Sequence, residues 1–307
     1  MDGFIDIYCE SGFLEKFLCA EKKKIWWNYF EDLFCAPSSI RITDIDSLDK
    51  FEGEILDMIL KSKDNKQNGE IVCLKEEREC MEITIREKYE DERYFSEKKH
   101  AIFLMDREKD ECAKMEKDYG LLFISKYNFY EYSLLFSPDI QEINENSNLW
   151  KCAANYNLPC NSMLLVDNFI MEKDIKDIEN NLHSLFEALL PKELRKTSFK
   201  IDVFTKKASD PSREEKNKKI IEDCIQKIER LYKIQVNINT QYNPNDHDRY
   251  LLTNYGLFMS GYGFVLTHSE RKKGTSLSFF PITHCSVNKR NNAYQIIQTL
   301  HDRKQSK

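Results

Sequence analysis

Two groups of residues in this sequence have the types and spacing needed for chemistry on phosphate. The first is a pair of acids that end apolar segments, Glu10 after residues 4–9 and Asp106 after residues 101–105. Carboxylates gathered at such positions can hold Mg²⁺ or Mn²⁺, which prefer oxygen ligands and can activate water for attack on a phosphodiester. The second group is His247, Arg249 and Asn254. A histidine can supply a nucleophile or proton donor, and a guanidinium can clamp two phosphate oxygens.

The C-terminal group lies in the segment His-Asp-Arg-Tyr-Leu-Leu-Thr-Asn, residues 247–254. We expect it to begin a strand, with His247, Arg249 and Asn254 on one side of the extended chain as a phosphate-binding trio. The alternative is a purely structural role, in which Asp248 and Arg249 form a local ion pair and His247 is an ordinary turn residue.

This segment resembles the phospholipase D superfamily motif His-x-Lys-x4-Asp, with Arg249 in the lysine place and Asn254 in the aspartate place. The resemblance covers residues 162–307 and is greatest to the degenerate C-terminal domain of MIT-domain proteins. It includes two further segments, Val-Asp-Asn-Phe at 166–169 and Gly-Tyr-Gly at 261–263. Arginine is a fixed charge, asparagine cannot orient a histidine as a carboxylate does, and the motif occurs once where the family's two-step chemistry uses two. The resemblance therefore implies binding of phosphate or of a protein partner, or catalysis in a homodimer.

The N-terminal acids resemble the pattern of PIN-like nucleases, in which one strand ends in an acid and a later strand ends in Asp before a helix. Glu10 takes the first acidic place and Asp106 the last, over residues 1–135. The middle acids are open among Asp44, Glu54, Glu87 and Asp91. Glu replaces Asp at position 10 and Gly12 replaces the usual Asn. The resemblance implies a Mg²⁺- or Mn²⁺-dependent nuclease acting on RNA or DNA; the alternative is that Glu10 caps a helix and Asp106 a turn.

Hydrophobic periodicity alternates between strand and helix in both halves of the chain. Strand-like segments at 4–9, 38–43, 101–105 and 121–124 alternate with helical patterns, and a second alternation begins at residue 163. This order predicts an α/β protein of two domains, each a mainly parallel sheet flanked by helices. The predicted boundaries are 1–136, a linker at 137–161 that lacks apolar periodicity, and 162–307.

Composition places the chain among soluble globular proteins, since it has 307 residues with 41% hydrophobic and 32% charged. We find no apolar run long enough for a membrane span and no signal peptide at Met1-Asp2-Gly3, so a cytoplasmic location is expected. The 10 cysteines are interpreted as reduced, and zinc-ligand spacings are absent. Residues 1–150 hold 34 Asp/Glu and 21 Lys/Arg, a charge of −13, while 151–307 hold 18 and 25, a charge of +7. An acidic half attracts cations and a basic half attracts phosphate.

Together these patterns predict a metal-dependent nuclease of the kind found among toxin or antiviral defence effectors, with a C-terminal domain that binds phosphate or a protein partner. The first alternative is a non-catalytic adaptor built from two degenerate enzyme folds. The second is a phosphodiesterase that uses His247 in a homodimer.

Overall fold

The chain folds as two compact units. Unit 1 comprises residues 1–138 and 281–307, and unit 2 comprises residues 139–280. The computed structural model describes residues 5–18, 33–34, 38–43, 50–64, 71–74, 100–136, 141–143, 149–168, 170–172, 174–242, 249–261, 264, 277–287 and 295–299.

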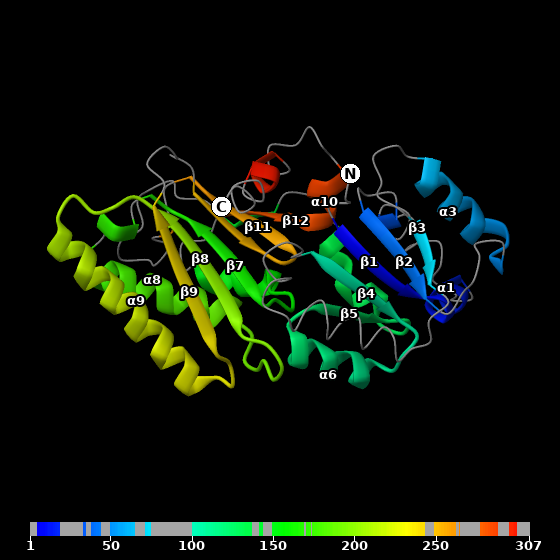
Figure 1. Ribbon diagram of the computed structural model, residues 1–307, viewed down its shortest axis with the longest axis horizontal. Helices are drawn as coiled ribbons and strands as arrows, with labels where there is room; N and C mark the ends of the chain where they lie inside the picture. Colours follow the sequence, from blue (N-terminus) through cyan, green and yellow to red (C-terminus); the bar gives the residue numbers. More distant parts are fainter. Residues whose placement is uncertain are drawn as a thin grey trace. The chain divides into compact units, whose positions relative to one another are not determined.

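Unit 1 contains a parallel sheet whose order in the described residues is β3-β2-β1-β4-β5 (Figure 1). The strands are β1 (Ile5–Glu10), β2 (Ser38–Thr43), β3 (Ile71–Leu74), β4 (Ala101–Met105) and β5 (Leu122–Ser125). β1 and β4 are buried along their whole length, which explains the continuous apolar sequence of β4; β1 also carries two buried acids, Asp6 and Glu10. The strand order reverses between β1 and β4, and ligands of open α/β sheets bind at the carboxyl side of such a switch point.

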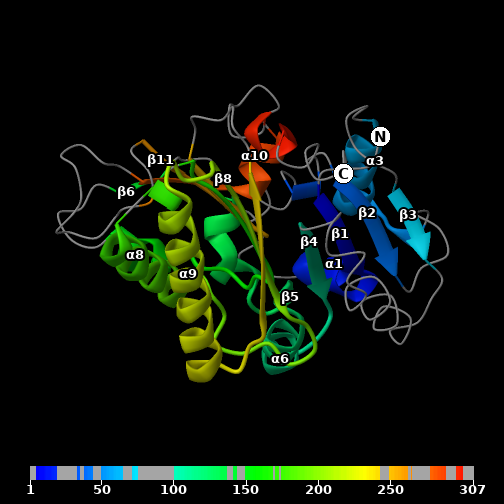
Figure 2. The same ribbon diagram turned by 60° about the vertical axis from the view of Figure 1, so that its left-hand side comes forward.

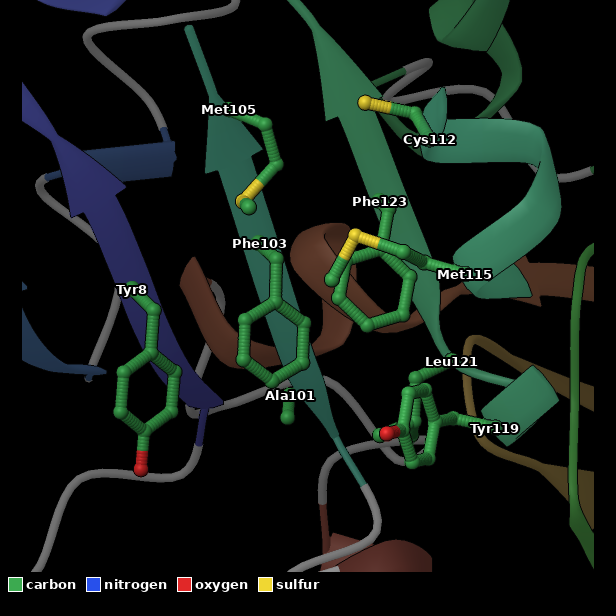
Figure 3. Close-up of a cluster of buried hydrophobic side chains, with 9 residues drawn as sticks. All are labelled: Tyr8, Ala101, Phe103, Met105, Cys112, Met115, Tyr119, Leu121 and Phe123. Carbon is green, nitrogen blue, oxygen red and sulfur yellow. The ribbon is translucent and has the colours of Figure 1, made fainter. Parts of the chain in front are cut away.

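Helices and an aromatic row form the core of unit 1. Its helices in the described residues include α1 (Ser11–Leu18), α3 (Gly53–Asp64), α6 (Lys109–Tyr119), the 3-10 helix η3 (Phe129–Phe136) and α10 (Ile282–Val287). Tyr8, Phe103 and Phe123 lie in register on β1, β4 and β5, and their rings stack with centroids 4.9 and 4.6 Å apart. Figure 3 shows Cys112 and Met115 of α6 in the same cluster, so α6 is held close to this face of the sheet.

Unit 2 contains a mixed sheet with the order β6-β12-β11-β10-β7-β8-β9 in the described residues. β7 (Ser162–Val166), β8 (Phe199–Thr205) and β9 (Val236–Tyr242) are parallel, whereas β10 (Tyr250–Thr253) is antiparallel to both β7 and β11 (Gly256–Ser260). β6 (Gln141–Ile143) and β12 (Leu277–Pro281) form another antiparallel pair. α8 (Ile175–Leu189) and α9 (Pro211–Leu231) pack side by side along the parallel strands (Figures 1 and 2). The described part of unit 2 also contains the short helices α7 (Leu149–Ala153), η4 (Ala154–Tyr156) and η5 (Ile170–Glu172).

The predicted α/β class with two sheets is confirmed, while the second sheet is mixed and not mainly parallel. The unit boundaries also differ from the predicted ones. Part of the predicted linker 137–161 forms β6, α7 and η4 in unit 2, because Trp150 and Ala153 are buried anchors in an otherwise polar stretch. Residues 281–307 group with unit 1 and not with the predicted domain 162–307. None of the helices described is both long and apolar enough to cross a membrane.

Candidate functional site

The predicted pair Glu10 and Asp106 meets at the switch point of the first sheet. Glu10 is the last residue of β1, and Asp106 directly follows β4, the adjacent strand. Oε2 of Glu10 accepts a hydrogen bond from the backbone N–H of Asp106 at 2.6 Å. The structure therefore brings these two acids together, as the carboxyl ends of neighbouring parallel strands require.

Glu10 is part of a buried ion pair. Its Oε1 lies 3.2 Å from Nε of Arg107, and the side chains of Glu10 and Arg107 are only 1% and 4% exposed. The same guanidinium donates from Nη1 to Glu111 of α6 at 2.9 Å. Both carboxylate oxygens of Glu10 thus accept hydrogen bonds from this chain.

Asp106 forms an ion pair with Lys126, which directly follows β5. The two side chains are 16% and 7% exposed, so the pair is largely screened from solvent. The other carboxylate oxygen of Asp106 lies against Gly12 in the first turn of α1, where an added Cβ would collide with it and lie 2.9 Å from Cγ. A larger residue at position 12 would therefore force the Asp106 carboxylate to shift.

The described residues do not fit the predicted Mg²⁺ or Mn²⁺ ion. They contain no group of three or more His, Cys, Asp or Glu arranged to hold a metal. At Glu10 and Asp106 the carboxylates are already engaged by Arg107, Lys126 and a backbone amide. Of the predicted middle acids, Asp44, Glu87 and Asp91 lie outside the described residues, as does the side chain of Glu54.

Cys9, beside Glu10, is not an alternative nucleophile at this edge of the sheet. Its side chain is fully buried, and desolvation followed by the negative charge of Glu10 raises the pKa of the thiol well above its ordinary value. A thiol rather than a thiolate is the resulting species at neutral pH. The other cysteines described, at 112, 160, 224 and 285, are also buried free thiols.

A second polar group lies in unit 2 where β7 ends beside the start of β10. Tyr250 pairs with Val166, so Arg249 lies beside Asp167, and Arg249 Nε is 3.8 Å from Asp167 Oδ1. Asp167 Oδ2 accepts a hydrogen bond from the backbone N–H of Phe264 at 3.3 Å. The next residue, Asn168, is 1% exposed, and neither its Oδ1 nor its Nδ2 has a hydrogen-bond partner in the described part of the chain.

Asn254 does not belong with Arg249, which corrects the predicted phosphate-binding trio. The two residues flank opposite ends of β10, and their separation of five residues places their side chains on opposite faces of an extended strand. Asn254 is fully buried, and its Oδ1 accepts hydrogen bonds from the backbone amides of Asn161 at 3.0 Å and Ser162 at 3.1 Å. It fastens the start of β7 to the end of β10. His247 lies outside the described residues.

The sequence patterns identified the acids at the first sheet but not the cations that neutralise them. Arg107 follows Asp106 directly, and Lys126 occupies the position after β5 that Asp106 occupies after β4. The carboxyl ends of parallel strands meet at one edge of the sheet for cations as well as for acids. Applied to cations, this rule would have placed both residues at that edge. Asn168 was noticed only as part of a family resemblance, because burial of its amide is not visible in the sequence.

Comparisons with known proteins leave the family undetermined. No protein-family model and no curated protein matches the chain. Among solved structures, the archaeal chromatin protein TrmBL2, described as showing a novel mode of DNA binding, is similar with a TM-score of 0.29 and 12% sequence identity. The match covers 64% of this chain and 62% of TrmBL2, so the chain spans less than two thirds of that protein. A similarity at this level is too distant to support a conclusion about fold or function.

Proposed function

We propose that this chain is a non-catalytic binding protein that holds a small phosphate-bearing ligand at the carboxyl end of β7. The observation that carries the proposal is Asn168, whose buried amide has no partner in the described residues. A buried amide left without hydrogen bonds destabilises the fold by about 1–3 kcal/mol. A bound ligand that supplies those hydrogen bonds is one way in which such a group is satisfied.

Arg249 is the cation of this polar group, and Asp167 offsets part of its charge. Its side chain is 19% exposed, so one part can contact solvent while Asp167, at 3.8 Å, holds the guanidinium beside the end of β7. A guanidinium can donate two parallel hydrogen bonds to phosphate oxygens, and an asparagine Nδ2 can add a third. Asp167 and the Gly261 carbonyl, which accepts from Nη1 at 3.4 Å, hold the guanidinium in place.

The nuclease hypothesis receives less support from the first unit. Of the acids that this hypothesis requires, Glu10 and Asp106 are neutralised by Arg107 and Lys126. For the others, at positions 44, 54, 87 and 91, the structure gives no side-chain position. The adaptor alternative requires no catalytic acids and accords with both ion pairs. A toxin or defence role stays a prediction, since the fold does not bear on it.

The charge of unit 2 favours a small ligand over a nucleic-acid strand. Residues 139–280 contain 20 Asp/Glu and 20 Lys/Arg, so unit 2 is formally neutral, and the other 32 acids and 26 bases give unit 1 a charge of −6. Polyanion binding relies on many phosphate contacts and counterion release, which a neutral unit provides weakly. The proposed ligand is defined only by its phosphate group. Whether that group belongs to free phosphate, a nucleotide or a nucleic acid is decided by the test that follows.

The test is calorimetry on the full chain with inorganic phosphate, a nucleoside monophosphate and a single-stranded oligonucleotide. We expect the monophosphate to bind, and Arg249→Met to weaken it by about tenfold or more, because a charged hydrogen bond contributes ~1.5–3 kcal/mol. Asn168→Ala should weaken binding too, yet raise the melting temperature of the ligand-free protein. The matched controls are Arg195→Met, which removes an exposed arginine paired with Glu193, and Asn254→Ala, which should lower the melting temperature.

Three outcomes would count against the proposal. Equal binding by wild type and Arg249→Met would exclude the arginine as the phosphate ligand. Tighter, steeply salt-dependent binding of the oligonucleotide would favour a nucleic-acid partner. Hydrolysis of a phosphodiester that disappears in His247→Ala would favour the homodimeric phosphodiesterase.

A further inference from the structure

The carboxyl edge of the first sheet carries a chain of alternating charges from three strands and a helix. Glu10 ends β1, Asp106 and Arg107 follow β4, Lys126 follows β5, and Glu111 lies on α6. The acids and bases contact each other in the order Glu111, Arg107, Glu10, and separately as Asp106 with Lys126. The backbone amide of Asp106 joins the two groups by donating to Glu10.

We infer that the switch-point crevice of unit 1 is filled by the protein's own side chains, with Arg107 and Lys126 where metal cations would bind and the Asp106 carboxylate where an anionic ligand would bind. We call these ion pairs and hydrogen bonds a structural lock, because they hold β1, β4, β5 and α6 together. This inference is independent of the proposed ligand site in unit 2.

The argument against a cation rests on burial. A metal ion at Glu10 and Asp106 would have to displace a guanidinium that is 4% exposed and an ammonium that is 7% exposed. Separating such a buried cation from its partner leaves an uncompensated charge, which is strongly unfavourable. The lock therefore competes directly with metal binding.

The argument against an anion rests on space and charge. In open α/β sheets, phosphates bind at the amino end of the helix that follows a strand at the switch point. Here that helix is α1, and its Gly12 has no room even for a Cβ because the carboxylate of Asp106 is in the way. The negative charge of Asp106 takes the place of the ligand's charge at this position.

Asp106→Asn in the full chain distinguishes a lock from a metal site by the sign of one measurement. In a lock, the substitution removes the charge that Lys126 pairs with, so the melting temperature of the metal-free protein falls. In a metal site, removing one of several crowded carboxylates relieves repulsion, and the melting temperature stays equal or rises. Lys126→Met should also lower the melting temperature, and the double variant should be no less stable than the worse single variant, because both remove one interaction.

The control variant is Glu131→Gln, which breaks an ion pair with Lys109 in the same unit whose side chains are 46% and 43% exposed. Its melting temperature should change little, since exposed pairs contribute little. Calorimetric titration of wild type with Mn²⁺ gives a second readout that does not depend on variants folding. We expect no saturable heat; saturable Mn²⁺ binding that Asp106→Asn abolishes, or a raised melting temperature in that variant, would overturn the inference.

Discussion

Glu116 on α6 shows how burial governs a single carboxyl group in this protein. Its Oε1 accepts hydrogen bonds from the Tyr132 hydroxyl at 3.1 Å and from the Phe123 amide at 3.4 Å. Both bonds favour the charged form, yet desolvation outweighs them and raises the pKa of Glu116 from 4.5 to about 7. The folded state therefore binds the Glu116 proton more tightly than the unfolded state does.

This raised pKa predicts a stability that falls as the pH increases. The contribution of Glu116 is fully present below about pH 4.5 and is lost as the pH rises toward 7. Glu116→Gln keeps an acceptor for Tyr132 without the charge, so its stability relative to wild type should grow between these values by at most roughly 3 kcal/mol. Urea denaturation of both proteins at several pH values measures the difference.

The control for this prediction is Glu131→Gln, because the hydrogen bond from Lys109 lowers the pKa of Glu131. That substitution should lose a little stability above about pH 4, the opposite sign. Parallel stability curves for wild type and Glu116→Gln would show that partial burial does not raise the pKa of Glu116.

At the residue scale, sequence reasoning found the acids Glu10 and Asp106 because strand ends are visible in the hydrophobic pattern. It did not find their partners Arg107 and Lys126, because which cation meets which acid depends on strand order, and parallel strands far apart in sequence become neighbours only in the folded sheet. Asn254 failed as a site residue for a different reason. Its hydrogen bonds to backbone amides of residues 161 and 162 depend on the pairing of β10 with β7.

At the scale of elements, the hairpin of β10 and β11 is fixed by contacts that the sequence does not show. The two strands are antiparallel, and Leu251 pairs with Phe258. The hydroxyl of Thr253 contacts both the N–H and the carbonyl of Gly256 at 3.2 Å. A Cβ at Gly256 would collide with the ring of Phe279 on β12 and lie 2.7 Å from its Cζ.

We therefore expect Gly256→Ala to destabilise unit 2 by about 1–3 kcal/mol, the usual effect of overpacking. Phe279 is 1% exposed and cannot swing into solvent to make room. Gly261→Ala is the matched control, because nothing lies within 4 Å of an added Cβ there. Thermal denaturation of the two variants should separate them; equal melting temperatures would mean that β11 and β12 are not packed as described.

At the scale of the whole molecule, the charge asymmetry of the sequence does not follow the compact units. The halves divided at residue 150 carry −13 and +7, whereas units 1 and 2 carry −6 and 0. The difference arises because the acidic residues 139–150 belong to unit 2 and the basic residues 281–307 belong to unit 1. A chain that returns to its first unit gives no signal in composition or periodicity, so this grouping required the structure.

Because residues 281–307 group with unit 1, we expect the stability of unit 1, and not that of unit 2, to depend on α10. Ile282 is fully buried, and α10 packs against η3 in unit 1. Truncating a buried isoleucine to alanine typically destabilises by ~2–5 kcal/mol. Ile282→Ala should therefore speed amide hydrogen exchange in η3 and β5 while leaving β7 and β8 unchanged, because local opening follows the unit that loses packing. Leu185→Ala, at a buried position of α8 in unit 2, is the reciprocal control and should speed exchange in β7 and β8 alone. Faster exchange in β7 and β8 after Ile282→Ala would instead assign the C-terminal segment to the second unit, as the sequence pattern had suggested.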